Sequence, residues 1–178
     1  MQQTYRYHSA SIVLHWLMLI LLVAVYACIE LREFFERGSE TRELFKHWHF
    51  MLGLSVGLLV IARLYFRLRF PTPPIIPTPP AWQSKLAKLV HGLLYLLMIG
   101  MPIGGWLILS GEAKPIPFFG LELPALMGPD KDLAHKIEEI HETVGKIGYF
   151  LIALHTVAAL FHHYVVKDDT MLRMKIGK

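Results

Sequence analysis

Four apolar runs, each long enough to cross a lipid bilayer, constrain the fold of this chain more than any other feature. They cover residues 9–29, 47–66, 86–109 and 141–166 of the 178-residue sequence. Each run is close to the ~20 residues that an α-helix needs to span about 30 Å of hydrocarbon. Because 54% of the residues are hydrophobic, little polar sequence is left for additional soluble domains. The sequence therefore predicts one all-α domain over residues 1–178, an integral membrane bundle of four helices.

The rest of the composition excludes several classes of protein. The single cysteine, Cys28, rules out an intrachain disulfide, a CxxCH attachment for covalent haem and a thiolate set for an iron–sulfur cluster. The net charge of +4 comes from basic residues beside the apolar runs, where they anchor helices, and not from a nucleic-acid-binding surface. No Asp or Glu lies deep in any run, which argues against a transporter. A redox cofactor would have to be held by other side chains, and ten histidines are available.

Histidines on the first, second and fourth runs have the spacing expected for two sites at different depths. His141 and His155 are fourteen residues apart. On one helix this places them about 40° apart around the axis and ~21 Å apart along it. His49 begins the second run and His15 lies near the start of the first. Antiparallel helices would pair His49 with His141 at an outer level and His15 with His155 at an inner level.

Paired imidazoles between apolar helices favour haem as the cofactor. A ligating histidine is neutral and offers one ring nitrogen to the metal, as a buried site between apolar helices favours. The macrocycle would fill the bundle while imidazoles from opposite sides complete the axial coordination. Since this leaves no open position for oxygen, the expected chemistry is electron transfer. We predict two haem b groups with the axial ligands His15, His49, His141 and His155, and no catalytic residue beyond them.

Two glycines and an arginine lie on the same helix faces as these histidines. Gly53 and Gly145 follow His49 and His141 by four residues, so each omits a side chain where a flat ring could lie. Ordinary close helix packing would explain both glycines equally well. Arg63, fourteen residues after His49, is a candidate partner for the propionates of the inner haem. Alternatively, Arg63 extends to the inner headgroups.

The other membrane histidines receive separate interpretations. His47 is about 200° from His49 around a helix, so both cannot face the bundle, and His49 is preferred because its stripe continues through Gly53. His91 is interpreted as a hydrogen-bonded core residue. His162 continues the stripe of His155 toward the inner headgroups, where it could donate a hydrogen bond to a quinone carbonyl.

The distribution of charge predicts that both termini are cytoplasmic. In that orientation the inner side holds ten of the 18 basic residues and two of the 14 acidic ones. The ten are Arg6, Arg63, Arg67, Arg69, Lys85, Lys88, Lys167, Arg173, Lys175 and Lys178. Between the second and third runs, the segment PTPPIIPTPP, residues 71–80, is expected to be extended polyproline II, either as a rigid spacer or as a docking site for a partner.

The chain resembles the bacterial cytochrome b561 family, including its di-haem superoxide oxidase type, in the histidine positions and in three stretches of sequence. The resemblance runs nearly end to end. It rests on the pair His15–Trp16, on RLYFRLRFPTPPIIP, residues 63–77, and above all on HETVGKIGYFLIALHTVAALFHHYVVKDDTMLRM, residues 141–174. It implies the same four axial ligands.

The resemblance also implies an activity, partners and a location. Superoxide would give an electron to the outer haem and ubiquinone would accept electrons near the inner one, with His162 as a contact. The protein would be a superoxide:ubiquinone oxidoreductase of the cell inner membrane. Attraction of superoxide would favour positive potential at the outer face, yet the outer segments are acidic on balance. The alternative is a membrane anchor that passes electrons from a quinol or from a dehydrogenase or hydrogenase partner to the quinone pool.

Overall fold

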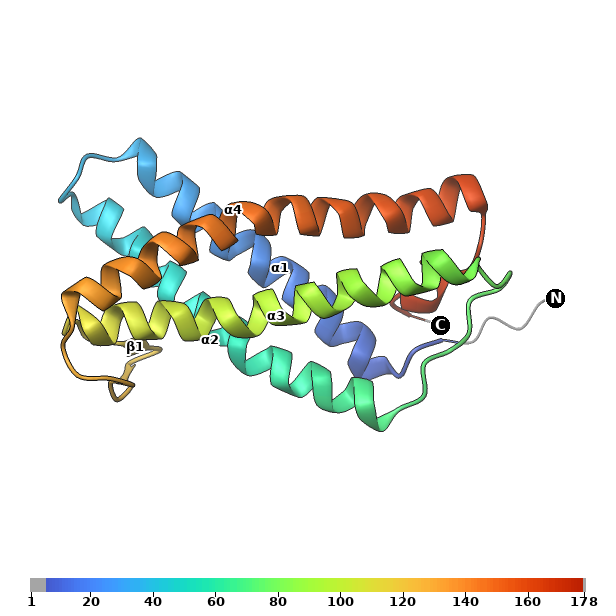
Figure 1. The fold of residues 1–178 in the computed structure, drawn as a ribbon, viewed down its shortest axis with the longest axis horizontal. Coiled ribbons are helices and arrows are strands. Elements are labelled where there is room, and N and C mark those ends of the chain that lie inside the picture. The colour runs from blue at the N-terminus through green and yellow to red at the C-terminus, as the bar shows by residue number, and fades with distance from the viewer. Residues whose placement is uncertain (1–5, 178) are drawn as a thin grey trace.

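The computed structural model describes residues 6–177, which form a bundle of four long helices (Figure 1). The helices are α1, Ser9–Leu31, α2, Glu40–Arg69, α3, Ala81–Gly111, and α4, Lys131–Phe161. All four are long and apolar enough to cross a membrane. Many large apolar side chains are exposed along them, including Ile20, Ile61 and Phe150. Lipid is the solvent that such a surface requires, so the predicted membrane four-helix bundle is confirmed.

The helices extend beyond the predicted spans because hydropathy marks only the lipid-facing part of each. α2 begins seven residues before its apolar run, where the Ser39 hydroxyl accepts a hydrogen bond from the backbone N–H of Arg42. α4 begins ten residues before its run, where Asp130 accepts one from the N–H of Leu133. These polar first turns lie outside the apolar stretch. At 30 and 31 residues, the helices have length to spare for tilting or for projecting into water.

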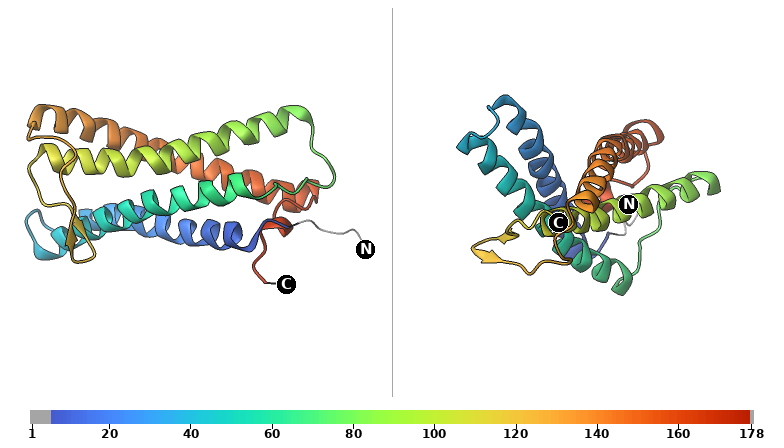
Figure 2. Two further views of the ribbon diagram at one scale, coloured as in Figure 1. Left: turned by 90° about the horizontal axis from the view of Figure 1, so that it is seen from below. Right: turned by 60° about the vertical axis from the view of Figure 1, so that its left-hand side comes forward.

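The connections lie at two opposite ends of the bundle (Figure 2). One end, here the hairpin end, carries the turn between α1 and α2, including a 3-10 turn at Arg32–Phe34, and a two-stranded hairpin of β1, Pro117–Phe118, and β2, Leu121–Glu122. The other, the terminal end, carries the α2–α3 connection and the chain after α4. There the backbone N–H of Tyr7 donates to the carbonyl of Arg173 at 3.2 Å. The first and last described segments are therefore neighbours.

Helix packing brings α1 against α2, α2 against α3 and α3 against α4. The buried core where three of these helices meet consists of Met18, Val56, Val60 and Met98. Gly57 makes the α2–α3 contact possible, because a Cβ atom there would lie 3.0 Å from Cβ of Pro102. This packing sets the distances between α4 and the helices that face it across the bundle.

The proline-rich segment has no helix or strand, as the sequence predicts. Three hydrogen bonds join it to the chain after α4. The N–H of Ile76 donates to Asp169 Oδ1 at 2.8 Å, the N–H of Asp169 donates back to the Ile76 carbonyl at 3.1 Å, and Arg173 donates to the Pro73 carbonyl at 2.5 Å. The segment is therefore attached to the chain that follows α4.

Candidate haem sites

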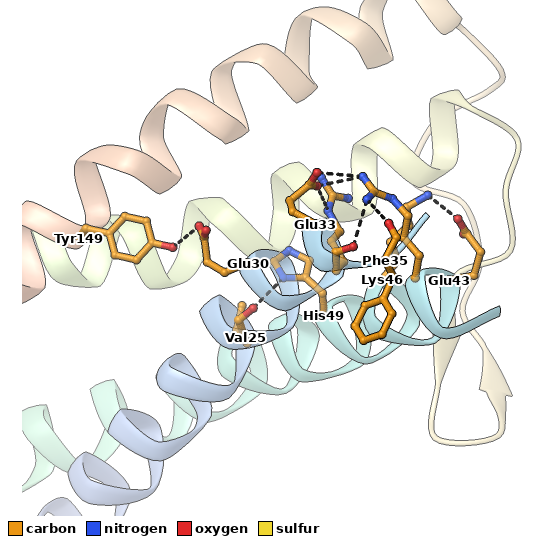
Figure 3. Close-up of polar contacts among 10 residues, drawn as sticks. Val25, Glu30, Glu33, Phe35, Glu43, Lys46, His49 and Tyr149 are labelled. Carbon is orange, nitrogen blue, oxygen red and sulfur yellow. Dashed lines mark hydrogen bonds and ion pairs between the residues drawn. The ribbon is translucent and has the colours of Figure 1, made fainter. Parts of the chain in front are cut away.

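At the hairpin end, α2 and α4 place two imidazoles face to edge. The ring centres of His49 and His141 are 6.4 Å apart, with an angle of 75° between the ring planes. His49 Nδ1 lies 3.0 Å from the carbonyl oxygen of Val25 on α1 (Figure 3). Because a carbonyl oxygen only accepts, Nδ1 is the protonated donor and Nε2 keeps its lone pair. This is the tautomer that a metal-binding imidazole needs.

A cavity of about 380 Å³ adjoins this pair. Gly53 and Gly145 both line it, as does Tyr26. No atom lies within 4 Å of the place where a Cβ of Gly53 would be, so this glycine faces open space. The mainly apolar lining of the cavity suits a flat hydrophobic cofactor.

A second glycine pair, which the sequence reading missed, supports His141 from α3. A Cβ at Gly104 would lie 3.2 Å from His141 Nδ1, and one at Gly105 would lie 3.7 Å from its Cε1. The two glycines let the ring lie against the backbone of α3. The sequence GMPIGGW contains the signal, but only the packing of α3 on α4 shows which side chain needs the space.

The mouth of the cavity carries charges of both signs. Its lining includes four basic residues, Arg32, Lys46, Lys114 and Lys146, and five acidic ones, Glu30, Glu33, Glu112, Glu138 and Glu142. Several are paired: Arg32 with Glu33 at 3.0 Å and Lys114 with Glu112 at 2.8 Å, while Lys46 pairs with Glu43 at 2.7 Å. The mouth is therefore not a cationic funnel.

At the terminal end, α1 and α4 form a second imidazole pair. The ring centres of His15 and His155 are 6.2 Å apart, at an interplanar angle of 82°. His91 on α3 also approaches, with its ring centre 5.3 Å from that of His155. The sequence interpretation of His91 as a core residue did not foresee this contact. Arg63 lies with its guanidinium 6.0 Å from the centre of the Tyr95 ring, and whether it binds a propionate stays a prediction.

The two pairs fit a metal held between opposed imidazoles. An imidazole–metal bond is about 2 Å long. Two such bonds in line span about 4 Å, and one ring radius on each side then places the ring centres roughly 6 Å apart. The ring centres of the two pairs are 6.4 and 6.2 Å apart. His15 Nδ1 and His141 Nδ1 are buried, and the described residues offer neither a hydrogen-bond partner. Within residues 6–177 no three His, Cys, Asp or Glu side chains gather to bind a bare ion. A macrocycle that supplies its own equatorial nitrogens removes that need, so haem suits the sites.

The remaining histidines separate by environment. His47 is exposed while His49, two residues on, faces the bundle. His162 Nδ1 is 2.5 Å from Asp168 Oδ2, a partner that no helical spacing could have indicated. A shallow hollow of about 480 Å³ at the terminal end is lined by His163 and five neighbours, Trp16, Met171, Leu172, Lys175 and Ile176. His163, and not the predicted quinone contact His162, lines this hollow.

The fold and the two histidine pairs together define a membrane cytochrome of the four-helix type. Residues 6–177 match the family model described as prokaryotic cytochrome b561, and the chain belongs to this family. Membership implies a b-type haem, and the distance between the imidazoles of each histidine pair suits such a group.

Curated relatives match along almost their whole length. The chain is 41% identical to cytochrome b561 homolog 1 of Escherichia coli strain K12, over 95% of this chain and 96% of the relative. It is 39% identical to the probable superoxide oxidase CybB of Yersinia pestis, over 95% of each. It is 30% identical to cytochrome b562 of Cereibacter sphaeroides, over 98% of each.

Proposed function

We propose that this protein carries two b-type haems and passes electrons from superoxide, at the hairpin end, to ubiquinone at the terminal end. The observation that supports it most is the pair of opposed imidazoles at each of two levels of one bundle. The name of the Yersinia pestis relative, a probable superoxide oxidase, supports the donor. In this proposal the protein lies in the cell inner membrane with both termini in the cytoplasm.

The role of each side chain follows from its place. His49 and His141 would hold one haem, and His15 and His155 the other. Bound haem supplies a one-electron carrier. The Val25 carbonyl fixes the His49 tautomer, and Gly53 leaves open space for a ring, whereas a Cβ at Gly145 would lie 3.5 Å from Cε of Met101.

The overall reaction balances with one quinone and two superoxide ions. Each superoxide loses one electron and leaves as O₂. Ubiquinone takes two electrons and two protons and leaves as ubiquinol. The protons must come from the protein or the water at the quinone end, because superoxide brings none. Ubiquinone would enter from the lipid near α4, with His162 as a candidate hydrogen-bond donor to its carbonyl.

Absorption spectroscopy of the purified protein tests the donor. A superoxide-generating system should produce the reduced b-type bands, and added superoxide dismutase should abolish them. Dithionite provides the reference for full reduction. Haems that dithionite reduces but a superoxide flux leaves oxidised would refute superoxide as the donor.

The mixed charge of the cavity mouth favours a second candidate. Five acidic side chains against four basic ones do not attract a small anion. A neutral quinol or a redox partner protein would not be opposed in this way. The protein would then be a membrane anchor and electron conduit, and its haems would be reduced by quinol, or by a partner that copurifies with it, and not by superoxide.

A further inference from the structure

The chain reverses direction directly after α4, and the reversal joins a histidine to a buried carboxylate. α4 ends in a π-helical turn at His162–Val166, and Lys167 follows in the left-handed conformation with φ 60°. The N–H of Asp168 donates to the His162 carbonyl at 3.2 Å. The turn therefore returns the chain so that Asp168 faces the ring six residues before it.

Asp168 and His162 form a close pair. His162 Nδ1 lies 2.5 Å from Asp168 Oδ2, and the Asp168 side chain has no exposed surface. Asp168 Oδ1 also accepts a hydrogen bond from the N–H of Thr170 at 2.8 Å. Burial by itself raises the pKa of Asp168, but the hydrogen bonds from His162 and Thr170 outweigh it and lower the pKa below its usual value. The carboxylate is thus ionised and can accept from a protonated Nδ1.

The second ring nitrogen of His162, Nε2, is left for another hydrogen-bond partner. Within residues 6–177 the hydrogen bonds of this ring involve Nδ1 alone. The side chain is 17% exposed, so part of the ring edge remains accessible. His162 directly follows the last residue of α4 and lies seven residues after His155, which is ~10.5 Å along the helix axis and on nearly the same face. The ring is therefore on the same side of the helix as His155, about two turns nearer the terminal end.

The segment around Asp168 is fixed by the proline-rich connection. Asp169 exchanges two hydrogen bonds with the backbone of Ile76, and Arg173 donates to the Pro73 carbonyl. Arg173 also lies 3.6 Å from Asp169. Asp168 is thus held in place by contacts that do not involve His162. A carboxylate fixed in this way can orient an imidazole, as the acidic member of a catalytic triad does.

We propose that Asp168 is a positioning residue that holds His162 as the proton donor to the quinone. This inference rests on the proposed function. Asp168 would keep Nδ1–H engaged and stabilise the imidazolium, so that Nε2–H can be given to a quinone carbonyl oxygen as the quinone is reduced. The N–H bond breaks and a quinone O–H bond forms, while the electrons arrive from the haem. His162 regains its proton from water at the membrane surface and serves again for the second proton.

Comparison of two electron acceptors tests the proposal. The haems of purified protein are reduced with dithionite, and their reoxidation is followed with a short-chain ubiquinone and with ferricyanide. Ubiquinone needs protons, whereas ferricyanide takes an electron alone. Asp168→Asn should slow reoxidation by ubiquinone about tenfold or more, as loss of a proton donor does. Reoxidation by ferricyanide should keep the wild-type rate.

Further variants separate proton transfer from a structural effect. His162→Gln should show the same loss, and the double variant should be no slower than either single one. Asp132→Asn, which neutralises an exposed carboxylate in the first turn of α4, at the opposite end of that helix from His162, should keep the wild-type ratio of the two rates. Independently of activity, ¹⁵N NMR of histidine-labelled protein should show a strongly hydrogen-bonded Nδ1–H that disappears in His162→Gln and in Asp168→Ala.

The results that would overturn the role of Asp168 differ from those that would overturn ubiquinone as the electron acceptor. Wild-type protein that ubiquinone does not reoxidise at all would end both the ubiquinone assignment and the role of Asp168. Normal reoxidation of wild type by ubiquinone, with Asp168→Asn unchanged, would overturn the role of Asp168 alone. Equal slowing with both acceptors would also overturn it, because Asp168 would then be structural.

Discussion

Among the single side chains, the four predicted ligand histidines lie in facing pairs between helices, and His91 approaches one of the pairs. His15, His49, His141 and His155 all face the interior, whereas His47, only two residues from His49, is exposed. The separation follows from helix geometry, since two residues correspond to about 200° of rotation. On α2, the helical period therefore indicated which of the two histidines faces inward. It did not indicate the Val25 carbonyl that fixes the His49 tautomer.

Removal of one imidazole should remove one haem. His49→Ala or His141→Ala should abolish the haem at the hairpin end, and His15→Ala or His155→Ala the one at the terminal end. Each variant should fall from about two haems per chain to about one, because a b-type haem is held by its axial ligands. The pyridine haemochrome assay on purified protein measures this ratio. His47→Ala is the control and should keep both haems, and equal haem content in all five variants would contradict the pairing.

Filling the space beside Gly53 should exclude the haem at the hairpin end. Gly53→Leu places a side chain in the cavity, where a Cβ now finds no atom within 4 Å. We expect haem content to fall by about half with the helices intact, since the new side chain occupies volume and not a packed contact. Gly100→Leu is the matched control. Gly100 is exposed and, like Gly53, has open space at its Cβ, but it does not line the cavity. If Gly53→Leu and Gly100→Leu bind the same amount of haem, Gly53 does not contact it.

At the scale of elements, periodicity and hydropathy predicted what is local. All four helices lie where an apolar run predicts one, and the proline-rich segment has neither helix nor strand. The polar turns that lengthen α2 and α4 were missed because the caps Ser39 and Asp130 lie outside the apolar runs. The hairpin of β1 and β2 and the π-helical turn were missed as well. Hydropathy carries no signal for a two-residue strand or for a single wide turn.

The contact between the proline-rich segment and the chain after α4 could not be predicted for another reason. Asp169 and Ile76 are 93 residues apart, and Arg173 and Pro73 are 100 apart. No period links residues at such separations. Only the return of both chains to one end of the bundle brings them together. The contact between Asp168 and His162 could not be predicted either. The two residues are near in sequence, but only the change of chain direction at Lys167 brings their side chains together.

Loss of Arg173 should release this contact. Arg173 is 5% exposed, so Arg173→Ala leaves the buried Asp169 without its cation and the Pro73 carbonyl without its donor. The expected cost is about 3 kcal/mol, as for other buried pairs that lose one member. Hydrogen exchange followed by mass spectrometry should show faster exchange in residues 73–77 and 168–174, with α1 and α3 unchanged. Arg69→Ala, which removes an exposed arginine nearby, should leave these rates as they are.

At the scale of the whole molecule, the two ends of the bundle differ in charge. The terminal end exposes four basic residues, Arg67 and Arg69 at the end of α2 and Lys85 and Lys88 near the start of α3, while its acidic residues Asp168 and Asp169 are buried at 4% and 8% exposure. The hairpin end holds most of the carboxylates, many of them around the cavity mouth. The charge imbalance that the sequence suggests is therefore stronger on the folded surface, because the two aspartates are buried and the four basic residues are exposed. Positive residues in short loops favour the cytoplasmic side of a membrane.

The terminal end should consequently face the cytoplasm. A reporter that is active only in the cytoplasm should function when fused after Lys178, and one that is active only in the periplasm should function when inserted at Gly120 in the hairpin. Replacing Arg67, Arg69, Lys85 and Lys88 together by glutamine should shift part of the population to the opposite orientation, since these residues flank the connection that must stay inside. The matched change of Arg32, Lys46, Lys131 and Lys136 at the hairpin end should leave the orientation intact. Periplasmic activity of the carboxyl-terminal fusion in the unaltered protein would refute the proposed orientation, and superoxide would then have to be supplied from the cytoplasm.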